Sequence, residues 1–546
     1  MLSGQRKTVT RAWMARGLSL ILVACGLLLT GPPPADAQSV QITLLHVSDT
    51  HSHLAAWGPK DGNLDGTLGG LPKAASLVAA ERALDPSALF VHAGDIIDGD
   101  FFFNEYLGVP ELQLLKSIGL DAFVLGNHEF RFGPDFLVGV LQAAWSDGGV
   151  PILGTNLNPQ GHALGAWITH TLIREVKGVK VGLFGLTTHK GALANPAPVV
   201  IQKITGALAQ AAVDELHGQG AQVVICVSHA GLSVMRGLPP AVSGIDVIVN
   251  GHDNAVLAQP EQVGRLGGGT TLIVSAGNLY RWVGRLRLSV EGGQVSLADY
   301  TLLSADAETP PLPAAQATID ALKAGIVARY GDVYHQPLAR AEQDLTMDWG
   351  SHSAKRDTAL GNLLADAYRA WTGADIALEP FAYIGYALPE GTIVGADLFR
   401  AMSYGNLAVV PAGQIALPWR LVTFRTSGSA LTGLLETLLF LGGDYYPQVS
   451  GLRLDYDSEA PMGEKILLDT VHVGGHKLLA EQLYSVAVTE GIYTALKYAL
   501  GLPMQDVQKL PDLAFDAVRL LASQRGDLGL ATSNRIRDVA AIPKAK

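Results

Sequence analysis

Short apolar runs alternate along the first half of the chain with longer stretches of helical periodicity. The runs ITLLHVS, ALFVHA, DAFVL, VVICV and DVIV are typical of buried strands. The stretches PKAASLVAAERAL, ELQLLKSIG and ITGALAQAAVDELHGQG are rich in Ala and Leu and predict helices. From about residue 41 to 303 this alternation predicts α/β layers. Near its end, TTLIVSAGN and WVGRLRLSV are predicted to be antiparallel strands that carry a hairpin to Tyr300.

A Pro-rich break at 308–313 predicts a domain boundary, because 546 residues are too many for one core. We expect a first domain at 38–305, a linking helix within 306–332 and a second domain at 333–546. The second domain combines helical stretches such as TALGNLLADAYRAWTG with strand patterns such as LYSVAVTEG. It is therefore also predicted to be α/β.

The first 37 residues have the pattern of an export signal. Basic residues precede an apolar stretch that is too short to span a bilayer, and Ala35-Asp36-Ala37 offers small residues for cleavage. An alternative is a lipid anchor at Cys25, because LVAC resembles a lipoprotein box. Either route predicts a periplasmic or extracellular protein without a transmembrane anchor after cleavage.

Composition narrows the range of partners. Charged residues make up only 16% of the chain and hydrophobic residues 48%, which indicates packed globular domains rather than disorder. The net charge of -11 argues against nucleic acid as a partner, because phosphate backbones require basic surfaces. Cys226 alone remains after cleavage and sits in an apolar strand, where it is expected to be a core residue. We expect a monomer or a dimer.

Potential metal ligands follow five of the predicted strands. Each alone is weak evidence, because Gly-Asp and Gly-Asn are also ordinary turn dipeptides. Together, at the edge where strands end, oxygen and imidazole donors suit a pair of divalent cations such as Zn, Mn or Fe. The candidate ligands are Asp49, His51, Asp95, Asn127, His229, His252 and Asn254.

The segments DTH, GDIIDG, GNHE, SHAG and GHDN resemble the calcineurin-like metallophosphoesterases. TALGNLLADAYRAWTGADIAL, LPEGTI, YGNLAVV and PQVSGLRLDY extend the similarity to the bacterial 5'-nucleotidase family across most of the second domain. The resemblance implies a four-layer αββα sandwich followed by an α/β 5'-nucleotidase-type C-terminal domain. It also implies hydrolysis of a small-molecule phosphoester by water activated between two cations.

The resemblance further implies a ligand set. Asp49, His51, Asp95 and Asn254 would hold one metal, and Asp95 would bridge to a second metal held by Asn127, His229 and His252. His128 resembles the family histidine that stabilises the transition state or protonates the leaving oxygen; the other interpretation is a hydrogen-bonding residue that holds its loop. Position 254 is His or Gln in the family, and the shorter Asn254 is expected to weaken the first metal.

The chain departs from the family pattern near the substrate. Relatives carry an aspartate at the position of Arg131, and Asp135 is a candidate substitute. Gly385 replaces an arginine that binds phosphate in relatives. Glycine has no side chain that could supply the two parallel N–H donors of a guanidinium. The remaining substrate-binding candidates are Arg356, near a second arginine position, and Tyr446, which matches the first of two aromatic positions that sandwich a nucleobase; Tyr493 lies close to the second.

The pattern favours an exported dimetal hydrolase of nucleoside 5'-phosphates or related small phosphoesters. One alternative is a thiosulfohydrolase-like enzyme of sulfur oxidation on the same scaffold. The presence of Asn127 and His128 disfavours it, since those relatives replace both residues. The other alternative is a metal-retaining binding protein with little turnover, which Arg131, Asn254 and Gly385 favour.

Overall fold

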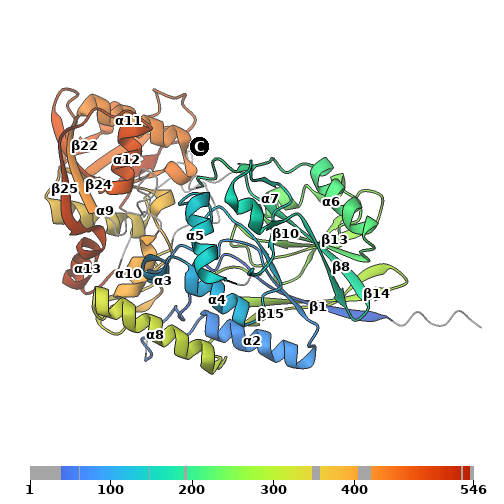
Figure 1. Ribbon diagram of the computed structural model, residues 1–546. Helices are drawn as coiled ribbons and strands as arrows, with labels where there is room; N and C mark the ends of the chain where they lie inside the picture. The colour runs from blue at the N-terminus through green and yellow to red at the C-terminus, as the bar shows by residue number, and fades with distance from the viewer. Residues whose placement is uncertain are drawn as a thin grey trace, which may run out of the picture.

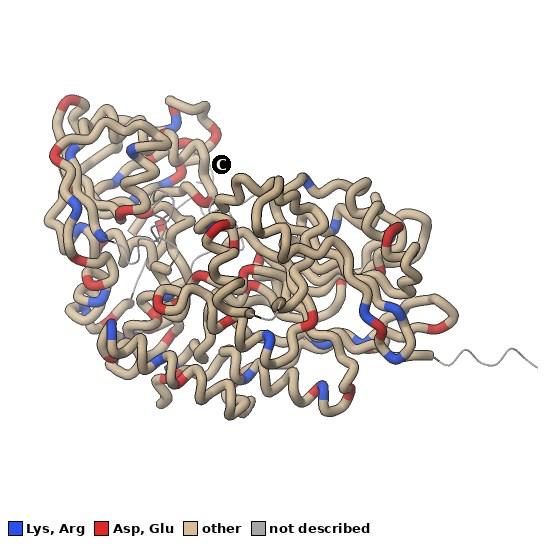
Figure 2. The backbone as a smooth tube through the Cα atoms, in the orientation of Figure 1, with Lys and Arg blue, Asp and Glu red and all other residues tan. Residues whose placement is uncertain are grey.

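The computed structural model describes residues 39–60, 62–146, 148–189, 194–346, 357–403, 420–529 and 533–540 (Figure 1). The predicted export signal, Cys25, Arg356 and the segment YGNLAVV lie outside these residues. Within the described ranges, no helix has the length and apolar character needed to cross a membrane. Lys and Arg are interspersed with Asp and Glu over both halves of the chain (Figure 2).

Two sheets form the first half of the molecule. The first has the order β15 (Gln294–Ser304), β14 (Trp282–Glu291), β1 (Val40–Val47), β2 (Leu89–His92), β3 (Ala122–Val124), β4 (Ile152–Leu153) and β6 (Ile168–Thr169). The second has the order β12 (Glu261–Gly264), β13 (Thr270–Val274), β11 (Val247–Asn250), β10 (Val223–His229), β8 (Val179–Thr187) and β7 (Thr171–Val176). The central strands of each sheet run parallel, so their carboxyl ends share one edge.

Helices cover the outer face of each sheet, which completes four layers. Side chains of both sheets meet in one core, where Leu44 and Val91 of the first sheet join Ile225 and Val249 of the second. The first sheet is covered by α2 (Leu71–Leu84), α4 (Val109–Ser117) and α5 (Pro134–Ala144). The second is covered by α6 (Gly206–Gly218) and α7 (Leu232–Met235), on the opposite side of the sandwich (Figure 1). The predicted αββα sandwich is confirmed.

The prediction that TTLIVSAGN and WVGRLRLSV are antiparallel strands is confirmed for WVGRLRLSV, whereas TTLIVSAGN is antiparallel only to β12. β13 lies parallel to β11 in the second sheet, whereas β14 pairs with β1 and β15 in the first. Both segments show the strand pattern, but a pattern of apolar residues does not specify the neighbouring strand. The hairpin itself is present, with Leu286 opposite Tyr300.

The second half is also α/β. Its main sheet has the order β20 (Pro447–Ser450), β17 (Ile376–Pro380), β24 (Leu483–Thr489), β19 (Arg420–Ser427) and β25 (Gln505–Leu513). The smaller sheets contain β16 (Pro337–Ala341) and β18 (Gly391–Val394), then β21 (Leu452–Tyr456), β22 (His472–Val473), β23 (His476–Lys477) and β26 (Ile536–Asp538). Its helices are α9 (Ala359–Thr372), α10 (Gly395–Ala401), α11 (Gly428–Leu441), α12 (Glu490–Tyr498) and α13 (Ala514–Arg525).

The two halves make extensive contact. Helix α8 (Pro313–Tyr330) connects them along one edge of the molecule and packs on α2 and on α3 (Phe101–Tyr106) (Figure 1). Phe101 stacks on Phe399 of α10 with ring centroids 3.9 Å apart. Lys60 donates to Asp397 at 2.6 Å, and both side chains are buried. The second half is thus held over the end of the first sandwich.

Candidate metal centre

The candidate ligands converge at the carboxyl ends of five strands. Asp49 and His51 follow β1, Asp95 follows β2, and Asn127 follows β3. In the second sheet, His229 ends β10, and His252 and Asn254 follow β11. The sequence predicted one edge, and the structure forms it from two facing sheets.

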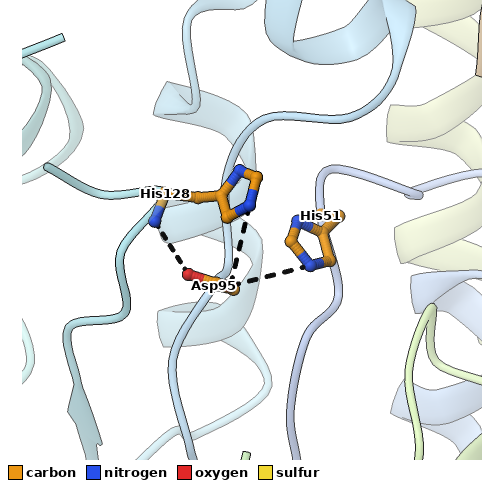
Figure 3. Close-up of side chains that lie close together, drawn as sticks. All are labelled: His51, Asp95 and His128. Atoms are coloured by element: carbon orange, nitrogen blue, oxygen red, sulfur yellow. Dashed lines mark hydrogen bonds and ion pairs between the residues drawn. The ribbon is translucent and has the colours of Figure 1, made fainter. Parts of the chain in front are cut away.

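The carboxylate of Asp95 lies at the middle of the group. Its Oδ2 is 3.0 Å from His229 Nε2, 3.8 Å from His51 Nε2 and 4.0 Å from His128 Nε2. Its Oδ1 accepts a hydrogen bond of 2.9 Å from the backbone N–H of His128. Figure 3 shows the rings of His51 and His128 turned toward Asp95 from separate loops.

Each of these three imidazoles is oriented through its other nitrogen. His229 Nδ1 donates to the carbonyl of Ala93 at 2.7 Å, and His51 Nδ1 donates to the carbonyl of Asp98 at 3.1 Å. His128 Nδ1 donates to the carboxylate of Asp98 at 2.9 Å. All three rings therefore present Nε2 toward Asp95, the arrangement that histidine ligands of metals require.

The remaining candidates lie around this centre. Asn127 Oδ1 is 3.3 Å from His229 Nε2, and the His252 ring is 5.1 Å from the His229 ring. Asp49 Oδ1 accepts from the His252 backbone N–H at 3.0 Å. Asn254 Oδ1 is buried without a hydrogen-bond partner among the described residues. A buried carbonyl oxygen without a donor is costly, and a cation would satisfy it.

Backbone strain is concentrated at this site. A positive φ, uncommon for residues other than glycine, occurs at Asp49 (51°), His51 (47°), Asp95 (54°), His252 (89°) and Asn254 (53°). Such conformations persist where the surrounding structure enforces them, most often at functional sites. Gly126 leaves room for the group, because a Cβ there would lie 2.1 Å from Asp95 Oδ1.

Burial and close charges shift the ionisation of the group. Burial raises the pKa of Asp49 to about 7 and lowers the pKa of His51 to about 3. Burial alone would raise the pKa of Asp95, but His229 and His128 hold it well below its usual range. Burial likewise disfavours the His229 cation, yet Asp95 raises the pKa of His229 to about 10. Mutually shifted groups of this kind are typical of functional sites.

The donor set fits two cations. Two groups of ligand atoms, His51–Asp95–His128 and Asp95–His229–His252, each lie within 4.8 Å of one another, and Asp95 belongs to both. A shared carboxylate with imidazoles on either side is suited to a bridged pair of Zn, Mn or Fe ions. The first group contains His128, a residue for which the resemblance implied a catalytic role.

Two acidic residues at this site escaped the sequence analysis. Glu129 accepts from the backbone N–H groups of Asp95 at 3.0 Å, Ile96 at 2.7 Å and Gly126 at 2.6 Å, and so ties the loops after β2 and β3 together. Asp98 supplies the acid partner of His128. The suggested substitute, Asp135, is wrong: its side chain is 97% exposed and accepts from His162. The second aspartate of GDIIDG was the available signal for Asp98.

Among the described residues of the second half, Tyr386 lies beside the centre. The Tyr386 ring centroid is 5.8 Å from that of His51 and 4.7 Å from that of His53. A Cβ on Gly385 would lie 2.0 Å from the carbonyl oxygen of Arg400, so the arginine of the relatives has no room here. Arg400 itself is buried and donates to Asp100.

The structure does not bring Tyr446 to the metal centre. Its side chain is buried, and its ring faces Tyr456 at 6.2 Å between centroids. Tyr493 is also buried, and its hydroxyl accepts from Lys497 at 3.0 Å. The neighbouring Tyr445 is exposed.

The sandwich and its centre define a calcineurin-like phosphoesterase, whose family model matches residues 42–255. A second model, the 5'-nucleotidase C-terminal domain, matches residues 338–496. The chain therefore has the two-domain organisation of the 5'-nucleotidase family, with a calcineurin-like phosphoesterase domain followed by a 5'-nucleotidase C-terminal domain.

Individual proteins similar to this chain include 5'-nucleotidases. A 5'-nucleotidase of Diplobatis ommata is 24% identical, with 79% of this chain and 77% of that protein covered. The chain spans about a third to two fifths of the length of several other curated relatives that it matches. The crystal structure of a 5'-nucleotidase precursor from Thermus thermophilus has a TM-score of 0.75 and 25% identity, covering 92% of this chain and all of that one. The sulfate thiohydrolase SoxB of the same species shares the fold, with a TM-score of 0.68, 18% identity and coverage of 94% and 99%.

Proposed function

We propose that this protein is an exported dimetal phosphoester hydrolase that releases phosphate from nucleoside 5'-phosphates or related small phosphoesters. The observation that carries the proposal is the set of three imidazoles whose Nε2 atoms converge on the shared carboxylate of Asp95. A paired site of this kind is suited to in-line displacement at phosphorus.

Asp49, His51, Asp95 and Asn254 would hold one cation, and Asp95, Asn127, His229 and His252 the other. When bound, the cations would supply Lewis acidity for the phosphoryl oxygens and lower the pKa of water. The protein's own contribution is positioning. Asp49 and Glu129 fix backbone N–H groups of the neighbouring loops, and the fixed Nδ1 contacts prevent rotation of the rings.

His128 is the proposed proton donor to the leaving oxygen. Its Nδ1 is engaged by Asp98, and its Nε2 lies on the side of Asp95. Burial opposes the His128 cation, but Asp95 and Asp98 raise the pKa of His128 above its ordinary value. A partial positive charge at this position also stabilises developing negative charge.

Nucleoside 5'-phosphates are the first substrate class because of the relatives' names and the second domain. The substrate contacts nevertheless differ from the family pattern. Tyr386 stands beside His51 where the neighbouring residue 385 is an arginine in relatives. Arg356 and Tyr446 remain the proposed substrate-binding residues of the sequence analysis.

The binding-protein alternative loses part of its support. Arg131 motivated it as a lost acid partner, yet Asp98 provides that acid at 2.9 Å from His128. Asn254 and Gly385 remain the departures that favour it. The thiosulfohydrolase alternative rests on a shared fold alone.

Purified residues 38–546 would test the proposal with Mn or Zn added and phosphate release measured from nucleotides, sugar nucleotides and simple phosphoesters. Release from nucleoside 5'-monophosphates, abolished by Asp95→Ala, would support nucleotide hydrolysis. Release from generic esters alone would indicate a different specificity. A protein that binds two metals but releases phosphate from none of these esters would contradict the proposed hydrolase function.

Export is a separate part of the proposal, with cleavage after Ala37 or lipidation at Cys25 as its two routes. Fractionation of cells expressing the full chain would locate the protein, and the mass of the mature N-terminus would separate the two routes.

A further inference from the structure

Asp98 contacts two histidines of the centre at once. Its carbonyl oxygen accepts from His51 Nδ1 at 3.1 Å, and its carboxylate Oδ2 accepts from His128 Nδ1 at 2.9 Å. Asp98 adopts a φ of 73°, which is strained for aspartate and directs both groups toward the site. Its own backbone N–H is held by Ser52 Oγ at 3.2 Å.

Arg131 makes an ion pair with the same oxygen of Asp98 that His128 contacts. The side chains of Arg131 and Asp98 are fully buried. Arg131 lies in the same turn as His128, since its backbone N–H donates to the His128 carbonyl at 3.1 Å. A buried carboxylate is tolerated only when it is paired, and this guanidinium provides the pairing.

We propose that Arg131 and Asp98 form a positioning unit for His128. Asp98 is the acid partner of the histidine, and the Arg131 guanidinium holds the Asp98 carboxylate in place. The resemblance implies an aspartate at position 131 in relatives, whereas the acid that contacts His128 in this chain is Asp98. Arg131 does not grip substrate, because its side chain is buried against Asp98. The inference rests on the proposed function, since it assigns how His128 is aimed.

The unit predicts a specific kinetic effect. Asp98→Asn preserves the side-chain shape but weakens the hold on His128 Nδ1. We expect kcat for adenosine 5'-monophosphate to fall about 10- to 100-fold with KM and bound metal little changed. The fall should be smaller for p-nitrophenyl phosphate, because nitrophenolate departs without a proton. Asp135→Asn, at an exposed aspartate on α5, is the matched control and should leave kcat unchanged.

A double variant separates positioning from stability. Asp98→Asn and Arg131→Met each leave the other charged side chain buried without its partner, so each should lower the melting temperature. Asp98→Asn/Arg131→Met removes both charges and should recover most of the lost stability, while kcat stays low. Recovery of kcat together with stability would show that the pair acts on folding alone and would overturn the proposal.

A measurement that does not depend on catalysis distinguishes a failure of the positioning unit from a failure of the proposed hydrolase function. In protein labelled with 15N-histidine, the Nδ1–H resonance of His128 is assigned by its loss in His128→Gln. We expect this resonance to disappear or shift in Asp98→Asn and to persist in Asp135→Asn. An unchanged resonance in Asp98→Asn would overturn the positioning unit, whether or not the wild-type protein releases phosphate. A wild type that hydrolyses neither ester with Mn or Zn contradicts the proposed function instead.

Discussion

Arg400 of the second half donates to Asp100 of the first at 2.5 Å, and both side chains are buried. The contact joins the end of α10 to the loop before α3, next to the stacked rings of Phe101 and Phe399. The same α10 segment faces the backbone of Gly385 and Tyr386, which approach the metal centre. This buried ion pair, together with Lys60–Asp397, therefore helps to fix the relative placement of the halves and the surroundings of the centre.

Arg400→Met should destabilise the protein by about 3 kcal/mol, because it leaves the Asp100 charge buried and unpaired. Asp100→Asn/Arg400→Met should cost less than Arg400→Met alone. Arg329→Met is the matched control, since Arg329 pairs with Glu105 near the same α3–α8 contact but is half exposed; it should cost no more than about 0.5 kcal/mol. Calorimetric unfolding of all three variants measures this, and equal losses in the two single variants would contradict it.

Gly385→Ala should destabilise the second half by roughly 1–3 kcal/mol, because its Cβ would lie 2.0 Å from the Arg400 carbonyl oxygen. Gly139→Ala, at an exposed position within α5 with open space around the new Cβ, should instead stabilise by roughly 0.5–1 kcal/mol. Denaturant unfolding of both variants compares the two effects. A neutral Gly385→Ala would show that the 400–403 segment moves freely, contrary to the structure.

Asn254→His should tighten metal binding at the first site, because a longer imidazole is the ligand that the family uses there. In the wild type, Asn254 Oδ1 is buried without a partner among the described residues. Competition with a chelator should require a higher chelator concentration in the variant than in the wild type. Equal or weaker retention would place residue 254 outside the ligand set.

Asp85 makes stability depend on pH in the acidic range. Burial opposes its charge, but Lys177, Ser87 and Thr43 together lower the pKa of Asp85 to about 2. Since the folded pKa lies below the unfolded value, its contribution is fully present above about pH 4 and is lost as the pH falls toward 2. The gap in melting temperature between wild type and Asp85→Asn should therefore narrow from about pH 5 to about pH 2.5. Asp320→Asn, on the exposed face of α8, serves as the control.

The convergence of the candidate ligands could be predicted because each follows an apolar run that becomes a buried strand, and parallel strands end at a common edge. Asp98 could not, because its role depends on a left-handed turn and on the approach of a loop from another strand. For the same reason Asp135, close after Arg131 in the chain, was a reasonable but wrong acid partner. The strand at Thr270–Val274 was predicted correctly, but its parallel pairing with β11 could not be predicted, since strand pairing is a property of the whole fold.

The second half was less predictable from sequence. Gly385 signalled a lost arginine, but the reason lies in the Arg400 carbonyl, which occupies the space that a side chain needs. Tyr446 matched a family position whose aromatic ring stacks on the nucleobase. Its side chain is nevertheless buried, directly after the short helix η5 (Gly443–Tyr445). Substrate recognition is set by such contacts rather than by local pattern.

The central claim is a pair of cations bridged by Asp95. The most direct measurement is the metal content of residues 38–546 after purification with Zn or Mn, compared between wild type, Asp95→Ala and Asp135→Asn. The account predicts two ions per chain in the wild type and in Asp135→Asn, and a loss of both in folded Asp95→Ala. One ion or none in the wild type, or two retained in Asp95→Ala, would contradict it.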